Sequence, residues 1–352
     1  MKFLREWGRT VVSIAVCAVL VLAGCFQLQS QLAVWDAIED SLEESMPDQF
    51  LMKKNGVQLL PDIKPSIKSV SPDAKFGPGA KVFQGGRMTM LANQSASQMM
   101  SFILESKGGS MIVVDGGTPD DAGHLADTLR TKGGHVRAWF ITHPHSDHVG
   151  ALTEILNNPD SGITIDNIYY SFTDLDWYHQ NEEYRADMVE KAVQALQTLP
   201  ADKLHGDIVK GQVITVDDVT VTVMNQPYLY EHNSINNSSV AYKVLMDGKA
   251  ILFLGDLGAE AGNQLLADCG AEALKADVVQ MAHHGQYGVT KEVYEAIRPE
   301  ICMWPTPGWL WDNDNGGGPG SGPWFTHETI QWVRELGVVS NYCIKDGDQI
   351  VE

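Results

Sequence analysis

Short apolar segments separated by polar turns fill the chain from residue 87 to its end. They are rich in β-branched and aromatic side chains, a pattern typical of buried strands. The pattern predicts strands at 87–92, 99–104, 110–114, 136–142, 163–170, 213–216, 219–224, 249–256, 276–282, 301–304, 338–342 and 349–351, and a further strand entered through 236–242. The two strands around Asp217-Asp218 are expected to form a hairpin.

Apolar positions at helical spacing occur between these segments. They predict helices at 119–132, 149–156, 176–199, 258–267 and from 324 or 325 to 336. Gly133-Gly134 after the first helix and Pro159 after the second are stop signals. Strands that alternate with helices in this way indicate an α/β fold.

Composition limits the classes of function. The 352-residue chain is 44% hydrophobic and 20% charged, enough apolar sequence for one large domain with or without appendages. Its formal net charge of −20 disfavours broad electrostatic capture of nucleic acid or anionic lipid, although a local basic groove is compatible with it. We therefore expect a small-molecule or surface-polymer substrate and no strong binding of nucleic acid.

Residues 1–25 have the layout of an export signal. Lys2, Arg5 and Arg9 precede the apolar run 11–22, and Leu-Ala-Gly-Cys ends at Cys25. This segment resembles a bacterial lipoprotein signal, in which the cysteine is acylated after cleavage. An uncleaved anchor helix and an ordinary signal peptide are the alternatives. Each of them predicts an extracytoplasmic domain, and a lipid or an anchor would tether that domain to the membrane.

Residues 26–84 are predicted to connect this leader to the domain at 85–352. Segment 31–46 has apolar residues at helical spacing and predicts an amphipathic helix that packs on the domain or lines a membrane-proximal stalk. Segment 53–81 is rich in Lys, Pro, Ser and Gly, as in a linker or a loop that wraps the fold.

The cysteines of the domain lack a Cys-x-x-Cys spacing. They are Cys269, Cys302 and Cys343. This spacing indicates neither a thiolate zinc site nor a disulfide scaffold. We expect small buried hydrophobic residues, with one bridged pair as the alternative.

Metal-ligating side chains gather at 142–150, Thr-His-Pro-His-Ser-Asp-His-Val-Gly, between a predicted strand and a predicted helix. They are His143, His145, Asp147 and His148. The first two, separated by Pro144 in an extended segment, can face the same way, and the other two can reach a second point nearby. Imidazole and carboxylate are the ligand types of zinc, iron and manganese sites, whereas packing alone does not explain this density.

Three further predicted strands end in side chains that are candidates for the same metal site. Gly255-Asp256 closes an apolar strand with a carboxylate beside a glycine, where metal and backbone can approach; a strand-ending turn is the alternative. The strand at 276–282 runs into His283-His284-Gly285. The strand at 110–114 runs into Asp115-Gly-Gly, which is otherwise a plain turn.

The pattern His-x-His-x-Asp-His after a strand resembles the signature of the metallo-β-lactamase superfamily. The later motifs Asn-Asn-Ser-Ser-Val at 236–240, Phe-Leu-Gly-Asp at 253–256 and His-His-Gly at 283–285 are similar to those of the competence DNA-internalisation (ComEC-like) hydrolase domain and of surface phosphorylcholine esterases. This resemblance covers about residues 85–305. It implies a four-layer αββα sandwich, with two mixed sheets back to back, helices outside and metals at one edge.

The same resemblance implies a role for each candidate residue. His143 and His145 match the ligands of a first metal, Asp147, His148 and His284 those of a second, and Asp256 the bridge between them. Asp115, Asn237 and Ser239 would order these ligands by hydrogen bonds. His283 is the alternative to His284 as a ligand and otherwise faces substrate. The candidate catalytic residues are His283 and Asp147, of which Asp147 can accept or relay a proton.

The implied chemistry is hydrolysis by a metal-bridging hydroxide. Two divalent ions, zinc by default and manganese or iron as alternatives, lower the pKa of a bridging water and stabilise the charge on an attacked oxygen. The chain is thus interpreted as an exported, membrane-tethered, binuclear metal-dependent hydrolase, a phosphodiesterase by resemblance. The extra histidine of true β-lactamases is missing where 236–239 lies, which puts β-lactam hydrolysis in doubt. The alternatives are an amide, lactone or thioester hydrolase of the same fold and a non-catalytic metal-binding surface protein.

Aromatic residues near the C-terminus are candidate pocket walls. Trp304, Trp309, Trp311 and Trp324 flank a Gly/Asn/Asp loop at 312–323. Their rings suit quaternary ammonium or sugar groups, or they pack over the sheet. Trp309, Trp311 and His232, which lies in the polar loop 225–236, are the candidate substrate-pocket residues. His232 is also a candidate substitute for the missing ligand.

Overall fold

The computed structural model describes residues 82–338 and 340–352. The predicted signal at 1–25 with Cys25, the helix at 31–46 and the linker at 53–81 lie outside these residues. Within the described ranges, no helix is both long and apolar enough to cross a bilayer.

The first sheet has eight strands in the order β15-β1-β2-β3-β4-β6-β7, with β5 paired to β4. Strands β1 to β3 form an antiparallel meander, and β3, β4, β6 and β7 are parallel. The bounds are β1 Arg87–Met90, β2 Phe102–Glu105, β3 Met111–Val114, β4 His135–Phe140, β5 Thr164–Ile165, β6 Ile168–Tyr169, β7 Leu204–His205 and β15 Gln349–Val351.

The second sheet has seven strands in the order β14-β13-β12-β11-β10-β9-β8. Strands β8 to β11 are antiparallel, including the predicted hairpin at Asp217-Asp218, and β11 to β14 are parallel. The bounds are β8 Val213–Val216, β9 Val219–Val223, β10 Tyr242–Met246, β11 Lys249–Phe253, β12 Val278–Gln280, β13 Ile301–Trp304 and β14 Ser340–Cys343.

The two sheets pack face to face through buried apolar side chains. Phe102 of the first sheet meets Phe253 of the second edge-on, with ring centroids 5.0 Å apart. Phe140 and Tyr242 make a similar pair at 5.2 Å. Burial of such rings removes a large apolar area from water, which is the main stabilisation of a fold of this kind.

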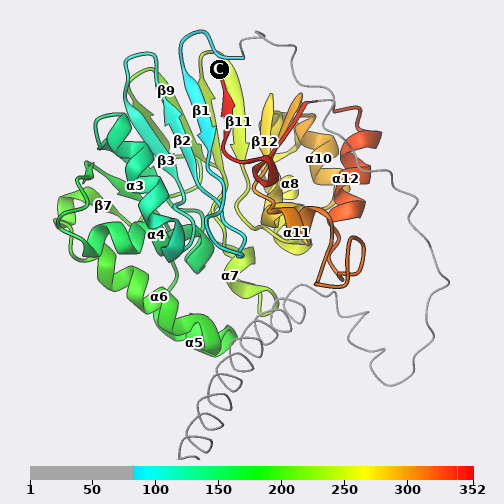
Figure 1. Cartoon of the computed structure of the whole chain (residues 1–352), viewed down its shortest axis with the longest axis horizontal. Coiled ribbons are helices and arrows are strands. Elements are labelled where there is room, and N and C mark those ends of the chain that lie inside the picture. Colours follow the sequence, from blue (N-terminus) through cyan, green and yellow to red (C-terminus); the bar gives the residue numbers. More distant parts are fainter. Residues whose placement is uncertain (1–81, 339) are drawn as a thin grey trace, which may run out of the picture. The chain divides into compact units, whose positions relative to one another are not determined.

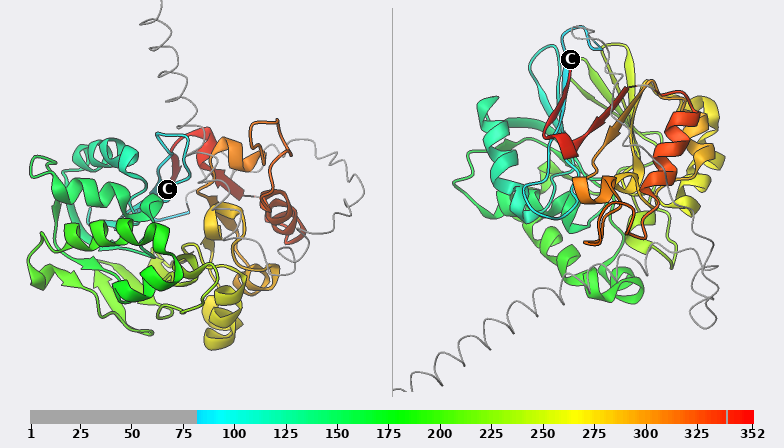
Figure 2. Two further views of the ribbon diagram at one scale, coloured as in Figure 1. Left: turned by 90° about the horizontal axis from the view of Figure 1, so that it is seen from below. Right: turned by 45° about the vertical axis from the view of Figure 1, so that its right-hand side comes forward.

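Helices cover the outer face of each sheet (Figures 1 and 2). Apolar residues of α3, α4 and α6 join the core of the first sheet, and those of α8, α10 and α12 join the outer core of the second. The bounds are α3 Ala122–Thr131, α4 Ser146–Asn157, α5 Leu175–Asn181, α6 Glu183–Leu196, α7 Ser234–Asn237, α8 Ala259–Cys269, α9 Ala271–Leu274, α10 Lys291–Ile297, α11 Gly308–Trp311 and α12 Thr326–Glu335. The predicted αββα sandwich is therefore confirmed.

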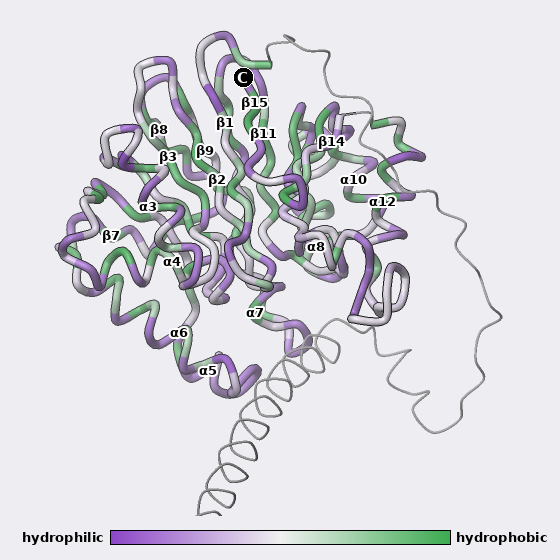
Figure 3. Tube along the Cα trace, viewed as in Figure 1, coloured by the Kyte–Doolittle hydropathy of each residue, from purple (hydrophilic) through white to green (hydrophobic). Residues whose placement is uncertain are grey.

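Hydropathy follows these layers. Figure 3 shows hydrophobic colour along the strands, hydrophilic colour in many loops, and both colours in alternation along the outer helices. In α3, Leu125 and Leu129 are fully buried four positions apart, while the intervening Asp127 is exposed. Gly133 and Gly134, with φ of 97° and 70°, end this segment as predicted, because a side chain there would be strained.

Several predicted elements differ from the observed ones. The strand at 163–170 is two short strands separated by Asp166 and Asn167, whose side chains bond to Arg137 of β4. The helix at 176–199 is two helices that meet at Glu182, where φ is −148°. Strands β14 and β15, which correspond to the predicted segments 338–342 and 349–351, belong to different sheets.

The described cysteines are all free. Cys302 and Cys343 are buried and Cys269 is partly buried, so the small-hydrophobe interpretation fits them and no pair among them is bridged.

Candidate metal centre

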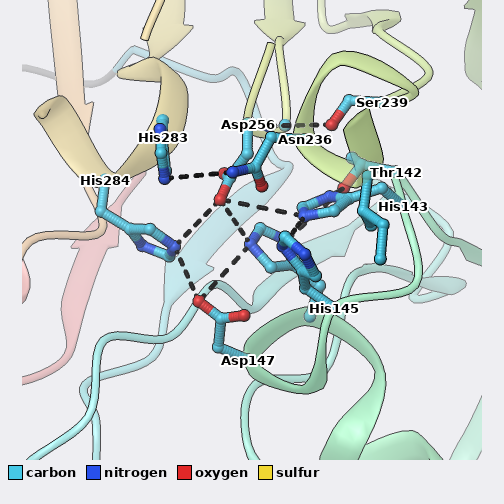
Figure 4. A network of polar contacts seen from close by, with 12 residues as sticks. Thr142, His143, His145, Asp147, Asn236, Ser239, Asp256, His283 and His284 are labelled. Carbon is cyan, nitrogen blue, oxygen red and sulfur yellow. Dashed lines mark hydrogen bonds and ion pairs between the residues drawn. The ribbon is translucent and has the colours of Figure 1, made fainter. Parts of the chain in front are cut away.

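The candidate ligands meet at one edge of the sandwich. In the first sheet the chain leaves β4 through Thr142 and His143 and enters α4 at Ser146, so the predicted strand-to-helix turn is confirmed. The carboxyl ends of β11 and β12 bring Asp256 and His284 to the same edge (Figure 4). Strands that end side by side in this way concentrate functional groups on their connecting loops.

Four buried side chains form the densest part of the cluster. One ligand atom each of Asp147, His148, Asp256 and His284 lies within 4.8 Å of the others. Asp256 Oδ2 is 3.2 Å from His148 Nε2 and 3.3 Å from His284 Nε2. Asp147 Oδ2 is 3.0 Å from His284 Nε2. Two imidazoles and two carboxylates at this separation make a typical divalent-metal donor set.

Hydrogen bonds fix which ring nitrogen faces the cluster. His148 Nδ1 is 2.7 Å from Asp115 Oδ2, and His284 Nδ1 is 2.9 Å from the carbonyl oxygen of Pro305. His143 Nδ1 is 3.0 Å from Thr142 Oγ1. A proton held on each Nδ1 by these acceptors leaves Nε2 free for a metal ion.

Buried atoms without partners support the assignment of the cluster to a metal. Within the described part of the chain, Asp256 Oδ1 has no hydrogen-bond partner, and His148 Nε2 and His284 Nε2 meet only the carboxylate oxygens of the cluster. A buried polar atom of this kind is costly unless another group satisfies it. The residues present therefore fit a divalent cation.

Charge in the cluster is strongly coupled. Burial opposes ionisation of Asp256, but His148 and His284 hold the pKa of this carboxyl well below its usual range. Burial likewise opposes protonation of His284, but Asp256 and Asp147 raise the pKa of this imidazole to about 9. Without a metal, the imidazoles thus act as the counter-cations of the carboxylates.

His143 and His145 lie on the other side of Asp256. His143 Nε2 is 3.1 Å from His145 Nδ1 and 3.9 Å from Asp256 Oδ2. Both imidazoles are buried. The predicted first-metal pair thus lies near Asp256, but neither imidazole belongs to the group of four convergent ligand atoms.

The residues predicted to order the ligands make different kinds of contact. Asp115 accepts from Thr142 N at 2.8 Å and from Thr142 Oγ1 at 2.7 Å, so it fixes the turn as well as His148. Ser239 Oγ accepts from the Asp256 backbone N–H at 3.1 Å. Asn237 contacts no ligand side chain in the described structure; it ties the carbonyl of His232 to the N–H of Gly258.

His283 faces the cluster differently from His284. Burial lowers the pKa of His283 to about 4, so this ring is neutral near pH 7. Its Nε2 is 3.4 Å from Asn236 Nδ2, an N–H donor. The geometry thus places His284 among the convergent ligand atoms and His283 beside them. Both residues have positive φ, 50° and 52°, a strained turn held by the bond from Thr306 Oγ1 to the His284 carbonyl.

Three contacting residues were absent from the predicted site. Glu182, buried where α5 meets α6, places Oε2 3.4 Å from His145 Nε2. Thr142 links Asp115 to His143, and Asn236 contacts His283. Thr142 and Asn236 belong to recognised motifs, whereas nothing in the acidic segment 176–199 distinguishes Glu182 from its neighbours.

The predicted pocket residues lie partly in the core. Trp311 is buried, and its ring meets Trp304 edge-on at 5.2 Å, which favours the packing alternative. Trp309 is partly exposed and donates its indole N–H to the Ala96 carbonyl at 2.8 Å. His232 is partly exposed and is absent from the group of convergent ligand atoms.

Comparison with known proteins agrees with this geometry. The family model described as the Metallo-beta-lactamase superfamily matches residues 97–300. A probable metallo-hydrolase of Bacillus subtilis (strain 168), YflN, is 34% identical over 65 residues, which cover 18% of this chain and 25% of that protein. The match therefore spans about a quarter of that relative's length.

Solved structures of low sequence identity are similar to this chain. The metallo-beta-lactamase fold protein YhfI from Bacillus subtilis is 12% identical, covers 75% of this chain and 99% of its own, and gives a TM-score of 0.46. BJP-1, a subclass B3 metallo-beta-lactamase of Bradyrhizobium japonicum, is 17% identical, covers 68% of this chain and 85% of its own, and gives a TM-score of 0.37.

Proposed function

Because this chain belongs to the metallo-β-lactamase superfamily, we propose that it is a metal-dependent hydrolase that cleaves phosphodiester bonds. The observation that supports the proposal most directly is the convergence of Asp147, His148, Asp256 and His284 within 4.8 Å of one another. Their free imidazole and carboxylate atoms form a donor set suited to divalent cations, with zinc as the default occupant.

The residues divide the work of such a site. Divalent ions bound there would supply Lewis acidity and lower the pKa of a water molecule. Asp147, His148 and His284 would hold one ion and His143 and His145 another, with Asp256 between them. Before metal binds, Asp256 is already ionised, because its two histidine neighbours hold its pKa low despite burial.

His283 supplies a neutral group next to these ligands. With its pKa at about 4 through burial, the ring carries no charge near pH 7. Its Nδ1 is 3.4 Å from the Tyr287 carbonyl, which favours the proton on Nδ1 and leaves Nε2 as an acceptor. His283 can therefore orient a substrate hydroxyl or take its proton without repelling the cations.

The preference for phosphodiesters rests on sequence. The order of the motifs at 236–240, 253–256 and 283–285 resembles the competence-type hydrolase domain, and the third histidine of true β-lactamases is absent. Amide, lactone and thioester bonds are the other substrates of this chemistry. We also propose that the segment 1–25 directs the domain out of the cytoplasm and tethers it to the membrane.

A panel of substrates tests the reaction class. Purified chain is incubated with bis-p-nitrophenyl phosphate, p-nitrophenyl phosphorylcholine and nitrocefin, alongside a His284→Ala variant. We expect turnover of a phosphodiester that the variant lacks and no turnover of nitrocefin. A lactone and a thioester are tested in the same way. Faster hydrolysis of nitrocefin, of the lactone or of the thioester than of both phosphodiesters would assign the site to another bond.

A further inference from the structure

The two candidate metal positions are unequal in their donors. One position is surrounded by four side chains, Asp147, His148, His284 and Asp256. The other position has His143 and His145, with Asp256 as its third candidate donor. We propose that Asn236 Oδ1 completes this second position and gives it an amide oxygen in place of a third imidazole. The inference rests on the proposed metal centre and concerns one residue of it.

The orientation of the Asn236 amide is fixed by its neighbours. The side chain is 1% exposed, and Nδ2 donates to Asn233 Oδ1 at 2.7 Å. The same Nδ2 lies 3.4 Å from His283 Nε2. Because both contacts require an N–H donor, the other amide atom must be Oδ1.

That oxygen is buried and unsatisfied. Among the described residues, Asn236 Oδ1 has no hydrogen-bond partner. Figure 4 shows Asn236 among the side chains of the site, with its amide nitrogen joined to His283. A buried carbonyl oxygen that lacks a donor, on a side chain bonded to His283 next to the candidate ligand His284, is suited to bind a cation.

A single carboxylate couples Asn236 to the first histidine pair. Glu182 Oε1 accepts from the backbone N–H of Ile235 at 3.1 Å, while Oε2 is 3.4 Å from His145 Nε2. The residue before Asn236 and the imidazole of His145 are thus held by the same side chain. These two contacts of Glu182 fix the spacing between the Asn236 amide and the pair His143 and His145.

An amide oxygen changes what the position binds. Carbonyl oxygen is a harder and weaker donor than imidazole, so the position should bind zinc less tightly and accept manganese more readily than a three-histidine site. The chain is therefore expected to bind one ion tightly and a second ion weakly. The weak ion is the one that depends on Asn236.

Metal titration of the metal-free chain tests the assignment. Zn²⁺ and Mn²⁺ are titrated against a competing chelator, and bound metal is counted by mass spectrometry. We expect Asn236→Ala to weaken the second ion about tenfold or more and to leave the first unchanged. The nearly isosteric Asn236→Asp should tighten Mn²⁺ at the same position, because it places a charged oxygen there.

Asn313→Ala is the control. It removes another buried amide, whose oxygen accepts from the backbone N–H of Trp324, so it should spare both ions. Equal weakening by Asn313→Ala, or no effect of either change at Asn236, would overturn the inference. If the wild-type chain binds only one ion at saturation, the inference about Asn236 is wrong, but the proposed hydrolase remains possible. If it binds no ion at all, the proposed metal centre itself is wrong. If Asn236→Ala does not fold, the Asp variant decides.

Discussion

At the scale of single residues, His148 and His284 each have one ring nitrogen bonded to an acceptor and the other directed at carboxylates. Asp115 and the Pro305 carbonyl hold the Nδ1 atoms of His148 and His284. The paired Nε2 atoms then lie 3.2 and 3.3 Å from Asp256 Oδ2. A metal ion would replace protons at these positions rather than enter an uncharged cavity.

Metal binding should therefore release protons. Burial opposes protonation of His148 and His284. The nearby carboxylates, Asp256 among them, nevertheless raise the pKa of His148 well above its usual value and that of His284 to about 9. Both rings are protonated in the metal-free chain near neutral pH, because the pH lies below their pKa values. Calorimetry at about pH 7.5 in buffers of different ionisation enthalpy should show release of about two protons with the tight ion. A His124→Gln variant is the control, and an enthalpy independent of the buffer would contradict this assignment.

Glu182 should act through His145. Burial opposes ionisation, but the bond from His145 lowers the pKa of Glu182, so the carboxylate is charged. Glu182→Gln keeps an acceptor for Ile235 and removes the charge beside the imidazole. We expect a 10- to 100-fold loss of metal affinity, about the cost of removing the carboxylate behind a ligating histidine. Glu190→Gln, which breaks the partly exposed contact between Glu190 of α6 and His179 of α5, should change nothing. Equal affinities of the two variants would show that Glu182 is not a positioning residue.

At the scale of elements, the ends of β4 and β11 are packed so closely that only glycine fits between them. Gly255 has a φ of +56°, and a Cβ there would lie 2.8 Å from Thr142 Cβ and 3.0 Å from Ser239 Cβ. The contact joins the turn of the first sheet to the segment that leads into β10. It places Asp256 beside the histidines.

Gly255→Ala should destabilise the domain by about 3 kcal/mol, since it adds backbone strain to overpacking. Gly248→Ala is the control, because its φ is +77° and no atom lies within 4 Å of the added Cβ. It should cost only about 1 kcal/mol of strain. Urea unfolding of both variants measures the difference, and equal losses would argue against close packing at Gly255.

Elements with a local signal were predictable and those set by distant contacts were not. The strand before His143 and the helix after it follow from apolar spacing, and the four convergent ligands follow from motifs next to strand ends. The break at Glu182 has no local signal, since a helical acidic segment is interrupted by bonds to His145 and Ile235. Likewise, Trp311 was assigned to a pocket because sequence alone does not reveal its packing on Trp304.

At the scale of the whole molecule, the domain and the leader at 1–25 are supported by different observations. The fold and the ligand cluster belong to the described residues, whereas export and tethering are proposals from residues 1–25. Cys25→Ser should abolish incorporation of labelled palmitate into the chain. Cys17→Ser, within the apolar run, should retain it. Label in neither wild type nor Cys17→Ser would favour an anchor helix or an ordinary signal peptide.

The metal content of the purified chain decides whether the cluster around Asp256 is a metal centre. Asp256 lies between both candidate positions, so the wild-type chain should hold about two divalent ions and Asp256→Ala should lose them while it stays folded by circular dichroism. A folded wild-type chain that binds no divalent metal under saturating conditions would contradict the account.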